Sequence, residues 1–507
     1  METTLYDFYD IVSPDAGAMI ESLRAYGYHL ETSIADIIDN SISADAHNIW
    51  VDCLWDGENS IISIKDDGFG MSEAVLKNAM RPGSKNPLQK RDPKDLGRFG
   101  LGLKTASFSQ CRKLTVGSKT ENTGIALRCW DLDYVNLCGE WRLAKPNNNN
   151  IPSVFSELEA MKSGTIVLWE KIDRLTKGTA ADNTKHQDLF FEQLDILKKH
   201  LAMVFHRFLE KPQCLKIFLN GKEIKPWDPF LRNHQSTQRL PLGYVKYCGK
   251  QIIVTPYILP HRSKLDDKSF EQAGGPGGWN ERQGFYLYRN ERLIVPGDWF
   301  GLVCRKGQPI RKEQFTKLAR IMVDIPNSFD GDWKIDVKKS VARPPNLIRS
   351  DFQHIARLTL KEAIKVYKYR GKVDKRPDSS FIFPWATSVQ HGTYHYSINR
   401  NHPLVLDILQ KSGDNNKKIQ AMLRMIEETV PVPLIILNGS NNPDKIQRPF
   451  EDTPHEELKI VLEEIWKSLI DSGMSREDAK KRLQYMEPFS DYPDFVNNFI
   501  QNYAGET

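Results

Sequence analysis

A glycine-rich segment that runs directly into a helical pattern constrains this chain more than any other feature. The segment covers residues 97–107, Gly-Arg-Phe-Gly-Leu-Gly-Leu-Lys-Thr-Ala-Ser. Glycines let the backbone approach a ligand closely, and a helix that begins there offers free N–H groups and the positive end of its dipole. The segment therefore suits a phosphate group. A lone Gly-x-x-Gly-x-Gly loop is nevertheless a weak motif, and two earlier patterns give it weight.

The first of these patterns is an acid and an amide that are four residues apart. Asp36 and Asn40 share one face of a helix that we expect over about residues 32–44. The Asn40 amide oxygen can serve a magnesium ion, which prefers oxygen ligands. Asp36 can orient a water molecule for attack on a terminal phosphate. A different face of this helix is expected to enter the core, through Ile34, Ile37, Ile38 and Ile42.

The second pattern is an acid at the end of a strand, followed by a glycine turn. Asp66 leaves the expected strand 60–66 into a turn that Gly68 and Gly70 permit. A buried carboxylate at this point can accept a hydrogen bond from the exocyclic amine of adenine, a donor that guanine lacks. Thr165, which follows Gly164 on a later strand, can place a hydroxyl beside Asp66.

Each pattern alone has an ordinary explanation, as an amphipathic helix, a turn or a loop. In this order within one α/β unit, they predict a pocket for ATP and Mg²⁺, with Lys104 adding a positive charge near the phosphates. Asp39 and Asp67 are expected to be capping or solvated acids. The residues expected at the nucleotide are Asn40, Asp66, Gly68, Gly70, Met71, Gly97, Gly100, Gly102, Leu103, Lys104 and Thr165.

These segments, together with Ser-Gly-Thr-Ile-Val at 163–167, resemble the ATP-binding boxes of the GHKL superfamily, which includes gyrase, the heat-shock chaperone, histidine kinases and MutL. The likeness covers about residues 13–170 and is closest to MORC-like and chaperone-like ATPase domains. It implies a Bergerat fold, an α+β two-layer sandwich, in which ATP is bound under a lid. It also implies dimerisation when ATP is held. By this match Asn40 is the magnesium ligand and Asp66 is the adenine contact.

The chain departs from the superfamily at Asp36. ATPases of this type usually have a glutamate there, as the base for the attacking water. Aspartate is one methylene shorter, and a misplacement of about 1 Å can cost roughly a hundredfold in rate. We therefore expect Asp36 to be the catalytic base of a slow ATPase.

A catalytic lysine is expected from a second domain. In MutL-, gyrase- and MORC-like proteins a transducer domain sends a lysine to the γ-phosphate. Residues 332–340 are expected to end a strand, and the alternation of its side chains favours Lys339 over Lys338. Two surface lysines at a strand end are an equal alternative. The pattern at 283–295 resembles a strand of MORC-like second domains, and its Arg289 and Arg292 are expected to be structural or to face a polyanion.

We expect an α/β protein in three parts: an ATP-binding domain at 1–210, a transducer-like α/β domain at 211–345 and a mostly helical region at 346–507. The Asn220-Gly221 turn predicts a hairpin at the start of the second domain. No apolar run is long enough to span a membrane. The seven cysteines form no C-x-x-C pair, which argues against zinc and favours a reduced, cytoplasmic protein.

The charge pattern leaves the partner open. The net charge of +5 identifies none, but residues 305–320 hold six Lys or Arg against one acid, and residues 361–376 hold seven against two. These segments can serve a polyanion or simply be solvated faces. We expect an ATP-gated dimeric clamp or switch on DNA or a DNA-processing partner, by analogy in bacterial defence. The alternative is a chaperone-like ATPase that remodels a protein client, with the aromatic stretch 381–396 as an adhesive surface.

Overall fold

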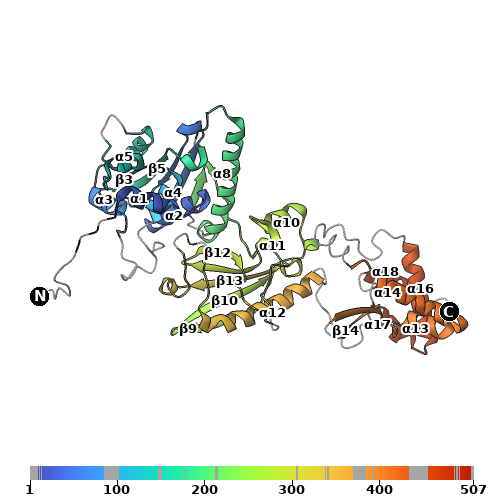
Figure 1. Cartoon of the computed structure of the whole chain (residues 1–507). Helices are drawn as coiled ribbons and strands as arrows, with labels where there is room; N and C mark the ends of the chain where they lie inside the picture. The colour runs from blue at the N-terminus through green and yellow to red at the C-terminus, as the bar shows by residue number, and fades with distance from the viewer. Residues whose placement is uncertain are drawn as a thin grey trace. The chain divides into compact units, whose positions relative to one another are not determined.

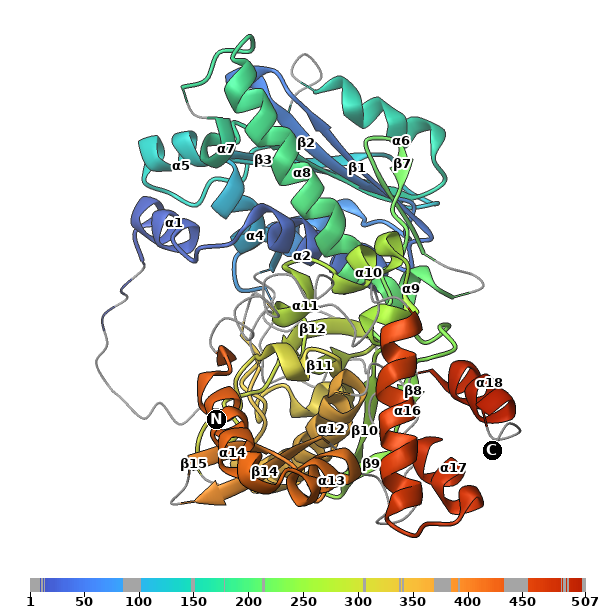
Figure 2. The same cartoon turned by 90° about the vertical axis from the view of Figure 1, so that its right-hand side faces the viewer.

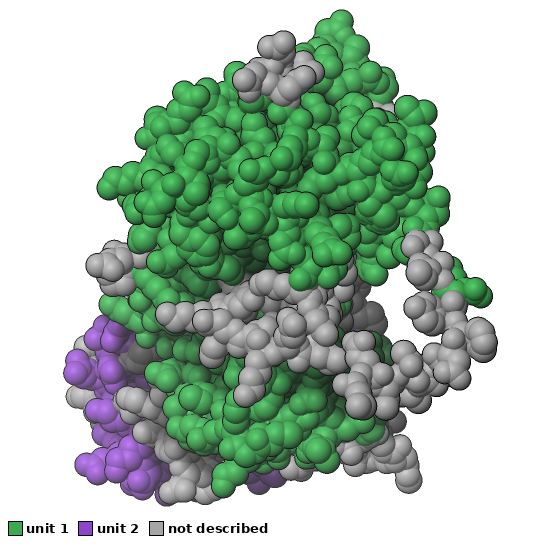
Figure 3. Space-filling view, turned by 90° about the vertical axis from the view of Figure 1, so that its left-hand side faces the viewer, with its two compact units in different colours: residues 1–372 green, residues 373–507 purple. Residues whose placement is uncertain are grey.

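The computed structural model divides into two compact units, residues 1–372 and 373–507 (Figure 3). Within the residues it describes, no helix is both long and apolar enough to cross a membrane. The described residues are 10, 12, 14–84, 102–146, 151–176, 178–211, 215–303, 307–336, 339, 342–368, 384–390, 393–432, 455–484, 486, 489 and 492–503.

A seven-stranded sheet organises the first part of unit 1 (Figure 1). Its strand order is β4-β3-β5-β2-β1-β6-β7, and all neighbours are antiparallel except β1 and β6. The strands are β1 (Asn48–Leu54), β2 (Ile61–Asp66), β3 (Lys113–Lys119), β4 (Ala126–Asp131), β5 (Gly164–Glu170), β6 (Lys216–Leu219) and β7 (Lys222–Glu223).

The hairpin of β6 and β7 turns at Asn220-Gly221, as predicted, and both turn residues have positive φ angles. Its position differs from our expectation, because it extends the first sheet instead of beginning the second domain. The backbone of β6 pairs with the edge of β1, and Ile217 and Leu219 are buried in the first core. The division of the chain at residues 210 and 345 stays a prediction.

Four helices pack together in a layer on the sheet: α1 (Ala16–Arg24), α2 (Leu30–Ser43), α4 (Gly102–Gln110) and α8 (Thr184–Val204). Figure 2 shows α8 crossing in front of the strands. The buried isoleucines of α2 face the core as predicted, which confirms that helix. Smaller elements complete this part: α3 (Glu73–Met80), α5 (Leu132–Cys138), α6 (Glu157–Ala160), α7 (Asp173–Thr176), α9 (His206–Leu209), η1 (Gly57–Asn59) and η3 (Ser153–Ser156).

A second, six-stranded sheet follows in unit 1, with the order β12-β11-β13-β10-β8 and β9 paired to β10. The helix α12 (Arg349–Lys368) packs on β10 and β13. The strands are β8 (Gln238–Arg239), β9 (Gly243–Tyr247), β10 (Lys250–Ile258), β11 (Gly284–Arg289), β12 (Arg292–Asp298) and β13 (Ala319–Ile325). Short helices and turns surround them: α10 (Asp267–Gly274), α11 (Gly278–Glu281), η4 (Arg262–Lys264), η5 (Gln314–Thr316), η6 (Asn327–Phe329) and η7 (Asn346–Ile348).

The strand expected at 332–340 is wrong. The chain turns through residues 331–334, and Lys334 and Lys339 both have positive φ angles, 49° and 52°, which a strand does not accommodate. The alternating apolar side chains that suggested a strand are Trp333 and Ile335, and both are buried in the second core from this turn. Val337 and Lys338 lie outside the described residues.

Unit 2 is mostly helical, as predicted. Its helices are α13 (Pro403–Lys411), α14 (Asn416–Thr429), α16 (His455–Asp471), α17 (Arg476–Gln484) and α18 (Pro493–Tyr503), with a short η8 (Gly413–Asn415). The last three enclose a core that includes Leu462 and Phe499. The aromatic stretch that the alternative function treats as an adhesive surface contains an antiparallel hairpin, β14 (Trp385–Gln390) and β15 (Thr393–Ile398).

Candidate nucleotide site

Asp36, on α2, contacts Lys339, a residue that follows the second sheet in the chain. Asp36 as a whole residue is 3% exposed. The Tyr28 hydroxyl donates to Oδ2 at 2.9 Å, and the Lys339 amine donates to Oδ1 at 3.1 Å. Of the two lysines considered from sequence, Lys339 is thus brought to the acid for which we predicted catalysis. Asn40, one turn further along α2, is exposed.

Asp39 is a second buried acid beside Asp36. The Lys339 amine lies 2.6 Å from Oδ2 of Asp39, and the Arg292 Nε lies 3.1 Å from its Oδ1. The expectation of a capping or solvated Asp39 is therefore wrong, because the residue is buried and its carboxylate pairs with two cations. Arg292 and Arg289 are also buried, and Arg289 pairs with Asp330, so the structural alternative describes both arginines.

The pKa values of the two neighbouring acids, Asp36 and Asp39, are shifted in opposite directions. Burial raises the pKa of Asp36, and the ion pair with Lys339 offsets only part of this effect. Burial would also raise the pKa of Asp39, but Arg292 and Lys339 more than offset it and hold that pKa below its usual range. Paired carboxyl groups that differ in this way can divide acid–base roles. Asp36 is the member better suited to accept a proton.

Asp66 ends β2 and is also buried. Its carboxylate accepts the Ser41 hydroxyl at 2.8 Å and the backbone N–H of Gly68 at 3.0 Å. Burial raises the pKa of Asp66 to about 6, although these two hydrogen bonds lower it. Because Ser41 is on α2, this contact ties the acid at the strand end to the helix that carries Asp36 and Asn40.

Ser118, which was not singled out from the sequence, connects two other residues that we predicted at the nucleotide, Met71 and Thr165. Thr165 is the cross-strand partner of Asp66, as expected, and its hydroxyl lies 2.9 Å from Oγ of Ser118. The backbone N–H of Met71 donates to the same Oγ at 2.8 Å. Ser118 therefore joins Met71 to Thr165, and Thr165 lies opposite Asp66 in the sheet.

The glycine turn after Asp66 is packed too tightly for side chains. Gly70 has a φ of 69°, and a Cβ there would lie 1.9 Å from the carbonyl oxygen of Lys119. A Cβ on Gly68 would lie 2.7 Å from the carbonyl oxygen of Ala44. These close approaches explain both glycines, since Gly68 lies against the end of α2 and Gly70 against the end of β3.

The glycine-rich segment is described from Gly102, where α4 begins. A Cβ on Gly102 would lie 3.9 Å from Oδ2 of Asp36, so the amino end of α4 faces this acid. Leu103 is partly buried against the main core. Lys104 is buried, and its amine donates to the carbonyl of Ala79 at 2.8 Å. Gly97 and Gly100 lie outside the described residues.

Two sequence comparisons relate this part of the chain to known proteins. Residues 28–165 match the family model of the histidine kinase-, DNA gyrase B- and HSP90-like ATPases. The chain is also 29% identical to ATPase morc-1 of Caenorhabditis elegans over 96 residues. That similarity covers 19% of this chain and 11% of the relative. This part of the chain is a GHKL-type ATPase domain. The predicted family is confirmed, and the matched range runs from Tyr28 to Thr165.

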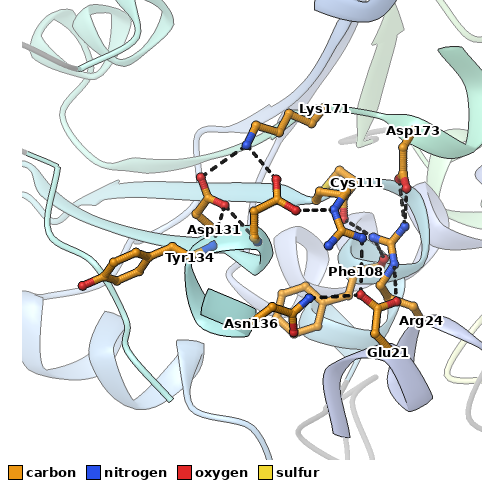
Figure 4. Close-up of polar contacts among 11 residues, drawn as sticks. Glu21, Arg24, Phe108, Cys111, Asp131, Tyr134, Asn136, Lys171 and Asp173 are labelled. Carbon is orange, nitrogen blue, oxygen red and sulfur yellow. Dashed lines mark hydrogen bonds and ion pairs between the residues drawn. The ribbon is translucent and has the colours of Figure 1, made fainter. Parts of the chain in front are cut away.

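Residues on either side of the matched range hold α4 at its carboxyl end as well (Figure 4). The buried guanidinium of Arg24, on α1, donates to the carbonyl oxygens of Phe108 and Cys111, each at 2.8 Å. It also forms a bidentate ion pair with Asp173. A cation at a helix carboxyl end is favourable. The helix whose amino end faces Asp36 is thus held at its other end by Arg24.

The described part of the basic segment, residues 307–320, is less available to a polyanion than its composition suggests, and Arg305 and Lys306 lie outside the described residues. Lys317 and Arg320 are buried, and Arg320 donates to the carbonyl oxygens of Pro229 and Ala273. Arg311 and Lys312 are exposed, and Lys312 pairs with Glu281. In the second basic segment Lys361 is exposed, and residues 369–376 lie outside the described residues.

A separate group of possible metal ligands, next to the GHKL domain, already has a cation. His206, Glu210 and Asp228 place one ligand atom each within 4.8 Å of one another. Arg232 forms ion pairs with both Glu210 and Asp228. His206 Nε2 lies 2.8 Å from the Tyr288 hydroxyl. The side chains therefore have partners within the protein, and we assign them no metal.

Proposed function

We propose that the protein binds ATP with Mg²⁺, hydrolyses it slowly, and uses ATP binding to switch a dimer that acts on DNA or on a DNA-processing protein. The observation that carries the proposal is the meeting of Asp36, Lys339 and the amino end of α4. Two of these groups come from the GHKL domain and one from the following domain. A terminal phosphate bound at such a site would contact groups of both domains at the same time.

The proposed catalytic groups are Asp36 and Lys339. Asp36 acts as the base that orients water, and its raised pKa supports this role. Lys339 contributes its positive charge to the γ-phosphate, where charge stabilisation lowers the barrier to phosphoryl transfer. The proposed phosphate contacts are the backbone N–H groups of Gly97, Gly100, Gly102 and Leu103, of which the structure describes Gly102 and Leu103. Lys104 adds its charge near the phosphates and also holds the end of α3 through Ala79.

The adenine is proposed to lie against Asp66. Its exocyclic amine donates to this carboxylate, which Ser41 and Gly68 already orient. Thr165 supplies a hydroxyl beside Asp66, and Met71 follows the turn made by Gly68 and Gly70. The density of hydrogen bonds around Asp66 supports a fixed recognition position for the base.

Asn40 is proposed to hold the magnesium ion. Its exposed amide is one turn from Asp36, and amide and phosphate oxygens are the hard ligands that Mg²⁺ prefers. A neutral amide also leaves the charge of the ion available. When bound, Mg²⁺ would neutralise negative charge on the triphosphate.

Slow turnover follows from the partners of Asp36. Its carboxylate is shorter than the usual glutamate, and its two oxygens are engaged by Tyr28 and Lys339. A water molecule must take the place of the Lys339 amine at Oδ1 before the acid can act as a base, while Tyr28 keeps the carboxylate oriented through Oδ2. The location proposed is a reducing compartment such as the cytoplasm, since the five cysteines in the described ranges are free thiols.

The proposal is tested on the full-length protein in two steps. Hydrolysis of ATP is measured with and without Mg²⁺, and light scattering after chromatography gives the mass with and without a non-hydrolysable ATP analogue. We expect magnesium-dependent hydrolysis and a shift from monomer to dimer with the analogue. Asn40→Ala should abolish the magnesium-dependent part of binding. Nucleotide affinity that is unchanged in this variant would contradict the metal role.

The nucleic-acid part of the proposal has its own test. A gel-shift assay with double-stranded DNA is repeated over a series of salt concentrations, with and without the ATP analogue. Contacts to phosphates give an affinity that falls steeply with salt. Absence of any DNA shift at low salt, while the protein still dimerises with ATP, would contradict DNA as the partner and favour the protein-remodelling alternative.

A further inference from the structure

Four buried charges form a continuous chain between the two domains. Arg292 Nε lies 3.1 Å from Asp39 Oδ1, Asp39 Oδ2 lies 2.6 Å from Lys339 Nζ, and Lys339 Nζ lies 3.1 Å from Asp36 Oδ1. The Asp36 and Asp39 side chains are each 2% exposed, Arg292 is 3% exposed and Lys339 is 10% exposed. When all four groups are ionised, the charges of the two carboxylates and the two cations cancel.

The chain is asymmetric around Lys339. Asp39 is held by two cations, whereas Asp36 shares Lys339 and accepts a neutral hydroxyl from Tyr28. If the amine moves toward a phosphate, Asp39 keeps Arg292 and remains compensated. Asp36 then loses its cationic partner and becomes the less compensated acid. Leaving a buried carboxylate without a cation is costly. Because Arg292 remains with Asp39 when Lys339 moves away, this cost is avoided at Asp39, and Lys339 can move more easily.

Arg292 is well fixed for this task. It follows a two-residue turn, Asn290-Glu291, in which both residues have positive φ angles, the geometry of a tight type I′ hairpin. Its Nη1 donates to the Leu293 carbonyl at 2.6 Å, and its guanidinium lies 5.2 Å from the centre of the Phe205 ring. The cation therefore reaches Asp39 from a rigid strand end of the second sheet.

We infer that Asp39 and Arg292 are a positioning pair that holds Lys339 where it can reach the terminal phosphate of ATP. Arg292 satisfies Asp39, so that this acid positions the lysine without retaining it. Neither residue of the pair touches the nucleotide in this inference. It rests on the proposed function, because it assigns the pair a role only through the γ-phosphate contact of Lys339.

The test compares the affinities of full-length protein for ADP and for a non-hydrolysable ATP analogue, both with Mg²⁺, by calorimetry. Their ratio reports the contact with the γ-phosphate, which a loss of structure alone does not select. Arg292→Gln leaves Asp39 with Lys339 as its cation, so the lysine is retained. We expect the preference for the ATP analogue to fall by about fivefold or more, with ADP affinity kept within about twofold.

Two further variants relate the effect to the lysine. Lys339→Met should also lower the ratio, and the double variant should match Lys339→Met alone, since the pair acts through Lys339. Arg292→Lys, which keeps the charge but lacks the planar fork, should restore part of the preference. If Arg292→Gln does not fold, the isosteric Asp39→Asn variant replaces it and should also lower the ratio, because a neutral amide no longer positions the lysine.

Arg289→Gln is the matched control. Arg289 is the cross-strand partner of Arg292 in the same hairpin, is equally buried, and pairs with Asp330 instead of Asp39. It should leave the ratio at the parental value. An equal loss in Arg289→Gln would overturn the inference, and so would a parental ratio in Arg292→Gln when Lys339→Met lowers it. A parental protein that does not prefer the ATP analogue, or in which Lys339→Met has no effect, would contradict the proposed function itself.

Discussion

The hydroxyl of Tyr28 donates a 2.9 Å hydrogen bond to Oδ2 of Asp36, eight residues later in the chain. Burial and the neighbouring Asp36 raise the pKa of Tyr28, so the phenol keeps its proton and remains a donor. Tyr28 comes just before α2 and Asp36 is in its second turn. The bond thus fixes the orientation of the proposed base from its own neighbourhood.

Tyr28→Phe should therefore lower kcat by about tenfold, since a hydrogen bond to a charged group contributes about 1.5–3 kcal/mol. A donor favours the ionised carboxylate, so its removal raises the pKa of Asp36 further. The acid limb of the plot of kcat against pH should then move to higher pH. Steady-state kinetics over a pH series measure both effects. Tyr26→Phe, at an exposed tyrosine two residues away, is the control. A parental profile in Tyr28→Phe would show that this bond does not orient the base.

Substitutions at Asp36 separate binding from hydrolysis. Asp36→Asn removes the base but keeps the shape of the side chain, so we expect hydrolysis to fall by about a hundredfold or more while ATP stays bound and the dimer accumulates. Asp36→Glu restores the usual length and should raise kcat, although the added methylene in a buried site costs about 1–3 kcal/mol of stability. Single-turnover hydrolysis and chromatography measure these outcomes. If both variants hydrolyse ATP at the parental rate, Asp36 is not the base.

The parts of the site that could be predicted from sequence depend on local pattern. The buried face of α2 and the glycine turn after Asp66 follow from spacings of a few residues. Asp39 was misjudged because its partners are 253 and 300 residues away, and no local pattern reveals them. Ser118 joins Met71 to Thr165 across three segments, which depends on the sheet order.

Two elements differ from the secondary structure that the sequence predicted: one helix was missed, and one predicted strand is a turn. The helix α8 was not predicted, although Phe190, Leu194, Leu197 and Leu201 recur at helical spacing and are buried. The strand expected around Trp333 was wrong, because alternating apolar residues can also be buried from a turn. Lys334 has a positive φ angle in such a turn. Nothing in the local sequence predicts that a lysine adopts this backbone conformation.

Nucleotide affinity should depend on pH through Asp66. Its pKa is about 6, and the amine of adenine favours the ionised carboxylate to which it donates. Binding should therefore strengthen as pH rises through about 6 and level off above it. The dissociation constant of ADP between about pH 5 and pH 8 measures this dependence.

Asp66→Asn is the control for that titration. The substituted side chain cannot ionise, so any pH dependence that remains in this variant comes from the phosphates of the nucleotide. Subtracting its profile from that of the parent isolates the contribution of Asp66. We also expect the substitution to weaken binding by about tenfold or more, because a charge-assisted hydrogen bond is lost. An identical pH profile in the variant and the parent would argue against Asp66 as the adenine acceptor.

The network in Figure 4 offers a matched pair of variants that test how α4 is held. Arg24 is buried, and its donors satisfy two carbonyl oxygens at the end of α4 as well as Asp173. Arg24→Gln leaves these acceptors without their cation, so we expect a loss of about 3 kcal/mol of stability and weaker binding of the ATP analogue. Arg112, in the same network, pairs with Glu21 and Asp133 nearer the surface, and Arg112→Gln should cost within about 1 kcal/mol. Calorimetric unfolding of the full-length variants, with and without the analogue, measures both quantities. Equal losses in the two variants would mean that α4 is held by the surface network as a whole, and that the buried contact of Arg24 with the helix end has no special part in presenting its amino end to the phosphates.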